Sequence, residues 1–569
     1  MRFRGVFMLF LLLLLMVQGC HSPLVRQAYW PVVSQQQSDA DLLARLRADW
    51  LLLGQKGASS QQRQAAMQRY NAALLVLVQR LRYDYSVSRS LKRYEGLQVQ
   101  HHLSRAGMNL IMLYDDIVPA ADVSLSDLQE RYTLAGVGVS LVGIIPPEKV
   151  ELSGDMFNIA TRGTVSALTA VLSFTPRGQP VLNLIPRLQQ GEVQVGCHQY
   201  PLAVDWSALL EVYWSLTRVK EDRILGLFRP QALRDTTGLS SITPYDPDKI
   251  PVILTHGLLS SAGTFDNLVN RLISDPLIRS NYQFWYFNYP TGVAWTISAR
   301  AYRESLALLR KKVDPGRTNR NWERMVLVGH SMGGLITHYC QCEAPWNLLR
   351  AADIPPEHLA PFLKPEYINK PFPDEQLNAL RGDYFFHPVE AGLVVYMATP
   401  HRGAPVARYR LAALLSRLVS LPQTLVQEVY NIATLQDDML LFNPSSAWQW
   451  FTSIGQLKPD SYSIVGLQGL SVRDVPTHSI IGDQGDGDCP RCTDGVVPYW
   501  SSHISWGTET IVPSDHSVQD APETALDMKR LLGDYALRYP AVRLRAGRKP
   551  RVLQQCKELR NRPCSALMK

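Results

Sequence analysis

The sequence predicts an α/β fold for residues 244–540, with a mostly parallel sheet and helices on both of its faces. Two observations support this prediction. Short apolar segments of strand character alternate with helical segments throughout this part of the chain. In its middle, the apolar segment 325–328 leads through the pentapeptide GHSMG at 329–333 into a helical stretch that begins at Leu335. In such folds we expect the functional site at the carboxyl ends of the strands.

Residues 1–19 have the composition of a secretory signal. Arg2 and Arg4 form the positively charged n-region. The apolar run 7–17 is shorter than a typical membrane-spanning helix. The end of this segment resembles the lipobox of bacterial lipoproteins, in which the cysteine, here Cys20, carries lipid such as palmitate. The alternative is an ordinary signal peptide that is followed by an incidental cysteine.

The residue after Cys20 is His21 and not Asp, which in a Gram-negative organism resembles the signal for outer-membrane sorting. We therefore expect an exported lipoprotein that is anchored in a membrane by its N-terminal lipid. Its expected place is the outer membrane, on the periplasmic face or at the cell surface.

Positive charge is concentrated at the C-terminal end. The chain has 569 residues, of which 46% are hydrophobic, and a net charge of +8. The tail 541–569 contains nine Lys or Arg residues and one acid, Glu558, so the remainder is near neutral. A neutral body argues against a nucleic-acid partner. The tail either touches anionic lipid or polysaccharide or is a solvated terminus.

The regions outside this α/β pattern differ from it in the spacing of their apolar residues. Residues 20–134 form a linker and a helical region, in which apolar residues recur at helical spacing. Residues 135–243 form a small β-rich or mixed region whose role the sequence does not reveal. Within 244–540, the insertions 343–390 and 404–458 interrupt the alternation. They build either a lid or wall for the substrate or a helix pair that caps the core.

The α/β part contains six segments of strand character and one long helix. The helix is predicted at 295–313, because its apolar residues fall on or near one face. The strands are predicted at 251–255, 282–289, 325–328, 392–397, 478–482 and 509–512.

Ser331 lies in the G-x-S-x-G pattern, between an expected strand and an expected helix. A serine hydroxyl at such a turn needs a histidine to accept its proton and a carboxylate to orient that histidine. The chain order serine, acid, histidine favours Asp494, in an Asp-Gly turn, and His516, after the last strand. Asp483 is the second choice for the acid and His503 the second choice for the base.

An ester carbonyl that is attacked at Ser331 also needs hydrogen-bond donors for its developing negative charge. The residue after the nucleophile, Met332, supplies one backbone N–H. The second is expected from the loop after the first strand, where we assign Leu258. His256 in the same loop is interpreted as a packing residue.

The cysteines are compatible with disulfides if the chain is exported. The Cys489-x-x-Cys492 pair is interpreted as a structural staple, with a redox or zinc half-site as the alternative. Three nearby acids, Asp483, Asp486 and Asp488, either bind calcium or form a solvated turn. Pairing is left open among the cysteines other than Cys20, which are Cys197, Cys340, Cys342, Cys489, Cys492, Cys556 and Cys564. We expect no metal ion and no cofactor in the catalytic site.

Four motifs together resemble the α/β-hydrolase superfamily, and especially its lipase and esterase branch. They are THGLL at 255–259, GHSMGG at 329–334, ATPH at 398–401, and DGVV at 494–497 followed by His516. The resemblance covers about residues 245–539. It implies a Ser-His-Asp triad, an acyl-enzyme intermediate and no cofactor, but the motifs are not specific for the substrate. The apolar insertion and the expected lipid anchor suggest carboxylic esters of acyl chains or lipids, and the substrate class rests on analogy. The Cys489-x-x-Cys492 pair departs from the family pattern. It lies in the loop that carries the expected acid, Asp494, which we call the acid loop.

Two alternatives stay open. The same triad supports acyl transfer or the hydrolysis of an amide, thioester or lactone. A chain of this fold can also serve as a non-enzymatic interaction lipoprotein of the cell envelope. The sequence does not predict the oligomeric state.

Overall fold

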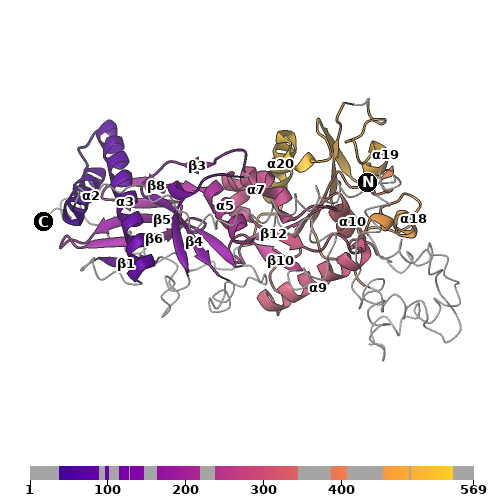
Figure 1. Ribbon diagram of the computed structural model, residues 1–569, viewed down its shortest axis with the longest axis horizontal. Helices are drawn as coiled ribbons and strands as arrows, with labels where there is room; N and C mark the ends of the chain where they lie inside the picture. Colours follow the sequence, from indigo (N-terminus) through magenta and orange to yellow (C-terminus); the bar gives the residue numbers. More distant parts are fainter. Residues whose placement is uncertain are drawn as a thin grey trace, which may run out of the picture.

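The computed structural model describes residues 38–88, 97–101, 114–126, 128–146, 163–217, 237–343, 386–405, 453–485 and 488–542. In these residues an N-terminal region lies at one end of an elongated arrangement and the α/β region at the other (Figure 1). Several predictions lie outside the described residues: the signal segment 1–19, Cys20, most of both insertions, and the tail beyond residue 542.

A seven-stranded sheet forms the α/β region, in the order β10-β12-β11-β13-β14-β15-β16. Every neighbouring pair is parallel except β10 with β12 at one edge. The strands are β10 Gly238–Ser241, β11 Ile250–Thr255, β12 Tyr282–Asn288, β13 Val326–His330, β14 Leu393–Met397, β15 Thr477–Gly482 and β16 Thr508–Val512. A mostly parallel sheet with this alternation of strands and helices confirms the predicted α/β fold class.

Helices cover both faces of this sheet (Figure 1). Consecutive strand residues point to opposite faces, and Ile253 accordingly lies in a different apolar cluster from Val252 and Leu254. One cluster includes residues of α9 Trp295–Val313 and α10 Met332–Tyr339. The other includes residues of α7 Asp266–Ile273, α8 Pro276–Asn281 and α20 Pro522–Arg538.

The structure corrects the predicted start of this region at residue 244. The edge strand β10 lies before it, and its Gly238 pairs with Asn288 of β12. The segment is short and consists of Gly, Leu and Ser, so it carries no recognisable strand pattern. Its pairing with a distant strand is what makes it part of the sheet.

The N-terminal region is less helical than the sequence indicates. Two helices, α2 Asp39–Gly54 and α3 Ser60–Ser88, pack together and against a five-stranded sheet. Two strands of that sheet, β1 Gln98–His101 and β2 Asp116–Pro119, fall within the predicted helical stretch 20–134. Segments of four residues show no clear periodicity, and their pairing partners are distant in the sequence. The sheet order is β1-β6-β5-β4-β2, with β4 Val139–Ile145, β5 Thr164–Phe174 and β6 Pro180–Pro186.

The helix α5 Trp206–Thr217 joins the two regions. It contacts β5 on one side and α7 of the α/β region on the other. At this junction the buried Ser207 hydroxyl donates to Asn270 Oδ1 over 2.8 Å. The Asn270 side-chain amide in turn donates to the carbonyl oxygen of Glu130 over 2.8 Å. The two regions therefore share one apolar cluster and a buried hydrogen-bond network.

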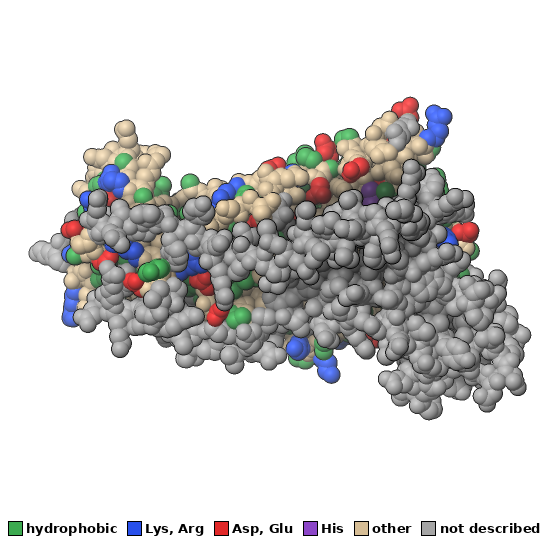
Figure 2. Space-filling view, in the orientation of Figure 1, with side chains coloured by type: hydrophobic (Ala, Val, Ile, Leu, Met, Phe, Trp, Pro, Cys, Tyr) green, Lys and Arg blue, Asp and Glu red, His purple; other side chains and the backbone are tan. Residues whose placement is uncertain are grey.

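On the face shown in Figure 2, acidic and basic side chains are interspersed among the described residues. None of the helices in the described part of the chain is both long and apolar enough to cross a lipid bilayer.

Candidate active site

The turn between β13 and α10 places Ser331 at the carboxyl edge of the sheet. Ser331 has φ 53° and ψ −125°, a backbone conformation that non-glycine residues seldom adopt. Such a conformation costs about 1–3 kcal/mol and persists only where its surroundings enforce it. Here the Ser331 N–H donates to the carbonyl oxygen of Met397 in the neighbouring strand, over 2.8 Å.

The glycines around Ser331 are required by close packing. A Cβ atom on Gly329 would lie 2.5 Å from Gly334 Cα. A Cβ on Gly333 would lie 2.2 Å from the Thr255 carbonyl oxygen, and one on Gly334 would lie 1.8 Å from Thr399 Oγ1. No side chain fits at these distances, so the pattern brings strand, helix and neighbouring loops into direct backbone contact.

Ser331, His516 and Asp494 form a hydrogen-bonded chain. The His516 Nε2 atom lies 2.9 Å from Ser331 Oγ, and its Nδ1 atom lies 2.8 Å from Asp494 Oδ2. An ionised carboxylate only accepts hydrogen bonds, so Nδ1 of a neutral His516 is the donor. Nε2 is then the acceptor for the Ser331 hydroxyl proton, which is the tautomer that a general base needs.

The Asp494 carboxylate is buried and fully engaged. Its side chain is 1% exposed, whereas that of His516 is 23% exposed. Its Oδ1 atom accepts hydrogen bonds from the backbone N–H groups of Val496, over 2.8 Å, and Val497, over 2.6 Å. These donors fix the carboxylate in the Asp-Gly turn and leave Oδ2 directed at His516.

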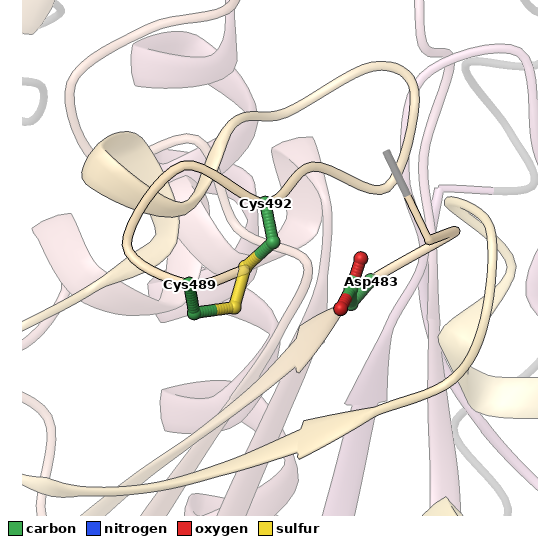
Figure 3. Close-up of side chains that lie close together, drawn as sticks. All are labelled: Asp483, Cys489 and Cys492. Carbon is green, nitrogen blue, oxygen red and sulfur yellow. A yellow bond between two sulfur atoms is a disulfide. The ribbon is translucent and has the colours of Figure 1, made fainter. Parts of the chain in front are cut away.

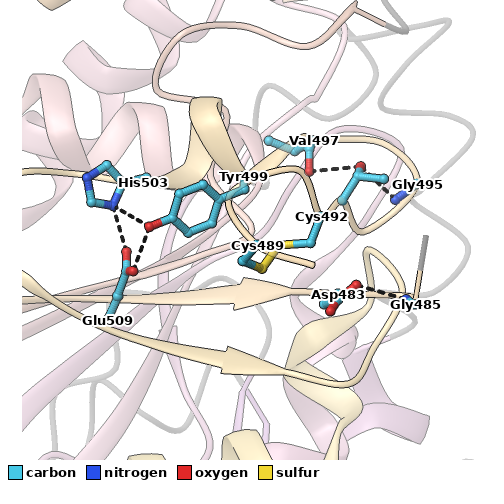
Figure 4. The surroundings of a disulfide bond; sticks show 10 residues. Asp483, Gly485, Cys489, Cys492, Gly495, Val497, Tyr499, His503 and Glu509 are labelled. Carbon is cyan, nitrogen blue, oxygen red and sulfur yellow. Dashed lines mark hydrogen bonds and ion pairs between the residues drawn. A yellow bond between two sulfur atoms is a disulfide. The ribbon is translucent and has the colours of Figure 1, made fainter. Parts of the chain in front are cut away.

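The second choices from the sequence lie elsewhere. Asp483 Oδ1 accepts a hydrogen bond from the Gly485 N–H over 2.8 Å (Figure 4). His503 Nδ1 lies 2.7 Å from Glu509 Oε2 and 3.1 Å from the Tyr499 hydroxyl, and the three side chains form a separate cluster (Figure 4). Neither residue is hydrogen bonded to the Ser331 and His516 pair.

The loop after β11 lies directly beside Ser331. A Cβ atom on Gly257 would lie 2.8 Å from Ser331 Cβ. Leu258, the next residue in the chain, is therefore also near Ser331. Among the hydrogen bonds of the described residues, none uses the backbone N–H of Leu258 or Met332. Both N–H groups therefore remain available as donors to a ligand.

His256 packs within this loop, as its sequence context suggests. Its ring stacks on Tyr289 with centroids 4.4 Å apart, and Nδ1 lies 3.1 Å from the Gly257 carbonyl oxygen. Burial lowers the pKa of His256 from 6.5 to about 4, so the ring is neutral at physiological pH.

Cys489 and Cys492 form a disulfide in the acid loop, two residues before Asp494 (Figure 3). Within the described ranges, the one group of side chains close enough together to ligate a metal is Asp483 with these two cysteines. Sulfur atoms in a disulfide are not thiolate ligands, so this group does not fit a zinc site as it stands. The calcium hypothesis involves Asp486, which lies outside the described residues.

Three further buried histidines have no role in the interpretation of the sequence. They are His338, His401 and His330. His338 on α10 and His401 after β14 approach each other with their Nδ1 atoms 3.0 Å apart. Burial lowers the pKa of both rings, that of His338 to about 3. His330, in the pentapeptide itself, contacts His516. Only its place beside Ser331 marked it in the sequence, because its partner lies in a distant loop.

No family model matches the chain, and no curated protein sequence matches it. Several solved structures resemble about half of it. BlEst2, a lipase of Bacillus licheniformis in its mature form, is 13% identical, with a TM-score of 0.29 over 51% of this chain and 93% of that chain. A carboxylesterase of the thaumarchaeon Nitrososphaera gargenis is 12% identical, with a TM-score of 0.26 over 53% and 97%.

A hydrolase from Pseudomonas aeruginosa is 11% identical, with a TM-score of 0.27 over 54% of this chain and 96% of that chain. These likenesses are weak.

Proposed function

We propose that this α/β-hydrolase domain is a serine hydrolase that cleaves carboxylic esters. The observation that carries the proposal is the hydrogen-bonded chain from Ser331 through His516 to Asp494, next to two unused backbone N–H groups. A carboxylate, an imidazole and a hydroxyl in this order are what nucleophilic acyl transfer requires.

In the proposed first step, Ser331 Oγ attacks the ester carbonyl carbon while its proton passes to His516 Nε2. Asp494 holds the imidazole in position and stabilises the imidazolium that forms. The N–H groups of Leu258 and Met332 donate to the oxyanion. The His516 proton then passes to the leaving alcohol oxygen as the C–O bond breaks, which leaves an acyl group on Ser331. Water, activated by His516, releases the acid in the second step.

For the substrate, we propose lipid or other acyl esters at a membrane. The support comes from the sequence, in which a lipobox-like Cys20 precedes the fold and the second insertion carries apolar residues at helical spacing. An exported enzyme that is anchored by lipid would meet acyl chains at the membrane surface. Metabolic labelling with palmitate tests the anchor: wild type should incorporate label, and Cys20→Ser should not. Equal labelling of both would exclude Cys20 as the lipid site.

A panel of p-nitrophenyl esters with increasing acyl length tests the proposed substrate class. We expect turnover in the wild type, with kcat/KM rising toward longer chains. The same panel with an added alcohol acceptor separates hydrolysis from acyl transfer, because a transferase would release ester product in preference to free acid. Turnover that falls steadily with chain length would exclude the lipid preference.

A further inference from the structure

We propose that His330 is a positioning residue that fixes the main chain of His516, and with it the distance between the His516 imidazole and Ser331. This inference rests on the proposed ester hydrolysis. His330 directly precedes the nucleophile and is the last residue of β13. Its Nε2 atom lies 2.8 Å from the main-chain carbonyl oxygen of His516, although 186 residues separate the two in sequence.

The direction of this hydrogen bond follows from its partners. A carbonyl oxygen only accepts, so the His330 Nε2 atom must carry the proton. The ring is buried, which lowers its pKa from 6.5 to about 3, and the neighbouring His516 imidazole acts in the same direction. The ring is therefore neutral, and its Nδ1 atom is unprotonated. That atom has no hydrogen-bond partner in the described part of the chain, so the one N–H of this ring is directed at His516.

His516 needs such a contact because of where the sheet places it. The strand before it, β16, is an edge strand and is separated from β13 by β14 and β15. The loop that carries His516 is secured on either side of it. Ser514 N–H donates to the Asp483 carbonyl oxygen over 3.1 Å, and Ser517 N–H donates to Asp515 Oδ1 over 2.9 Å. Neither bond ties the loop to the turn that holds Ser331.

The hydrogen bond from His330 provides the missing connection between this loop and the turn that holds Ser331. It connects the backbone of His516 to the residue next to Ser331, while the side chain of His516 reaches Ser331 Oγ itself. His516 is therefore held at its main-chain carbonyl by the buried His330 ring, in addition to the contacts of its imidazole with Ser331 and Asp494. Because a displacement of about 1 Å can lower a rate by about 100-fold, loss of the backbone contact should slow the chemical step without weakening substrate binding.

The variants His330→Phe and His330→Gln separate positioning from packing. Phe keeps a ring of similar volume and removes the donor, whereas the Gln side-chain amide retains an N–H that can reach the same carbonyl. Tyr282→Phe is the matched control. It removes another buried side-chain donor, which bonds the Leu532 carbonyl oxygen over 2.7 Å in the same domain but away from the site. Each full-length variant is assayed for kcat and KM on a p-nitrophenyl ester, for its rate of fluorophosphonate labelling, and for thermal unfolding.

We expect His330→Phe to lower kcat and the labelling rate by about 10- to 100-fold with KM near the wild-type value. His330→Gln should recover most of the loss, and Tyr282→Phe should change only thermal stability. If His330→Phe does not fold, His330→Asn, whose amide is too short to reach the carbonyl, should show the same loss of kcat. An active wild type together with wild-type kcat in the folded donor-free variant would overturn the role of His330 alone. A wild type that is inert to esters and to fluorophosphonate would overturn the proposed function, and this role with it.

Discussion

The Oγ atom of Ser331 lies 2.9 Å from Nε2 of His516, although 185 residues separate them in the chain. The parallel sheet explains this proximity. Ser331 follows β13 and His516 follows β16, and the two strands end at the same edge because they run in the same direction. Asp494 reaches this edge from the loop between β15 and β16. The arrangement leads to specific expectations for each of these residues and for their supports.

Asp494→Asn should lower kcat by about 10⁴-fold, because an amide in place of the carboxylate favours the wrong imidazole tautomer. Asp483→Asn is the matched control, since Asp483 directly follows β15 and its Oδ1 atom, which an asparagine retains, accepts the Gly485 N–H. We expect its kcat to stay near that of the wild type. Steady-state ester hydrolysis measures both, and a large loss in Asp483→Asn with full activity in Asp494→Asn would reverse the assignment of the acid.

Reduction of the Cys489–Cys492 disulfide should lower kcat. The bridge, which Figure 4 shows, closes a loop just before Asp494. The Cys492 carbonyl oxygen accepts the Tyr499 N–H over 3.0 Å. The chain-entropy model assigns about 2 kcal/mol to the closure of so short a loop. Activity measured before and after phosphine treatment, together with a count of free thiols, tests the effect.

The double variant Cys489→Ser/Cys492→Ser is the control for this experiment. It should have the low activity of the reduced protein, and reductant should not lower that activity through the acid loop. Cys340 and Cys342 are buried and already free. Cys197 is disulfide-bonded as well, so a response to reductant that remains in this variant reports on Cys197. Full activity after complete reduction of the wild type would show that the acid loop does not need its bridge.

Leu209→Ala should destabilise the α/β region although the residue belongs to α5 of the N-terminal region. Leu209 is fully buried in the apolar cluster that also contains Phe265 and Leu268 of the α/β region. Truncation of a buried leucine costs about 2–5 kcal/mol. We expect ester hydrolysis and tryptophan fluorescence to be lost together at a lower temperature.

Leu216→Ala on the same helix is the control, because Leu216 is 37% exposed. Its unfolding temperature should remain close to that of the wild type. Separate unfolding transitions for the two regions in either protein would contradict a shared core.

The stability of the folded chain should fall as the pH drops from 6.5 toward 4. Burial lowers the pKa of His256 in the folded chain to about 4, from an ordinary value of 6.5. The unfolded chain therefore binds more protons than the folded chain in this window, so the stabilising contribution is complete above pH 6.5 and is lost below it. His330 and His338, also lowered by burial, act in the same direction.

His256→Phe tests this linkage, because a phenyl ring retains the stacking on Tyr289 and does not titrate. The slope of the unfolding free energy against pH between 4 and 6.5 should decrease by up to about 1.4 kcal/mol per pH unit. Chemical denaturation at several pH values measures the slope. An unchanged slope would show that His256 is not the titrating group.

The strands of the α/β region could be predicted because their cores are continuous apolar segments. The predicted strand 251–255 lies within β11, and the predicted helix 295–313 has the bounds of α9. The G-x-S-x-G pattern was informative for the same physical reason, since its glycines are needed wherever backbones touch. What these segments share is a local signal of burial or close approach.

Other features have no local signal. The strands β1, β2 and β10 are short, and tertiary pairing with distant strands determines them. The contact between His330 and His516 depends on the register of four parallel strands, which the sequence alone does not reveal. Asp494 and Asp483 both follow β15, so only the folded structure shows which carboxylate is directed at His516.

Fluorophosphonate labelling of Ser331→Ala tests the central claim most directly. The full-length wild type should be labelled at one serine and should lose ester hydrolysis in proportion to labelling. Ser331→Ala should be folded, unlabelled and inactive, because no other hydroxyl lies within hydrogen-bond distance of His516 Nε2 among the described residues. Persistent labelling and turnover in Ser331→Ala would contradict the assignment of the nucleophile.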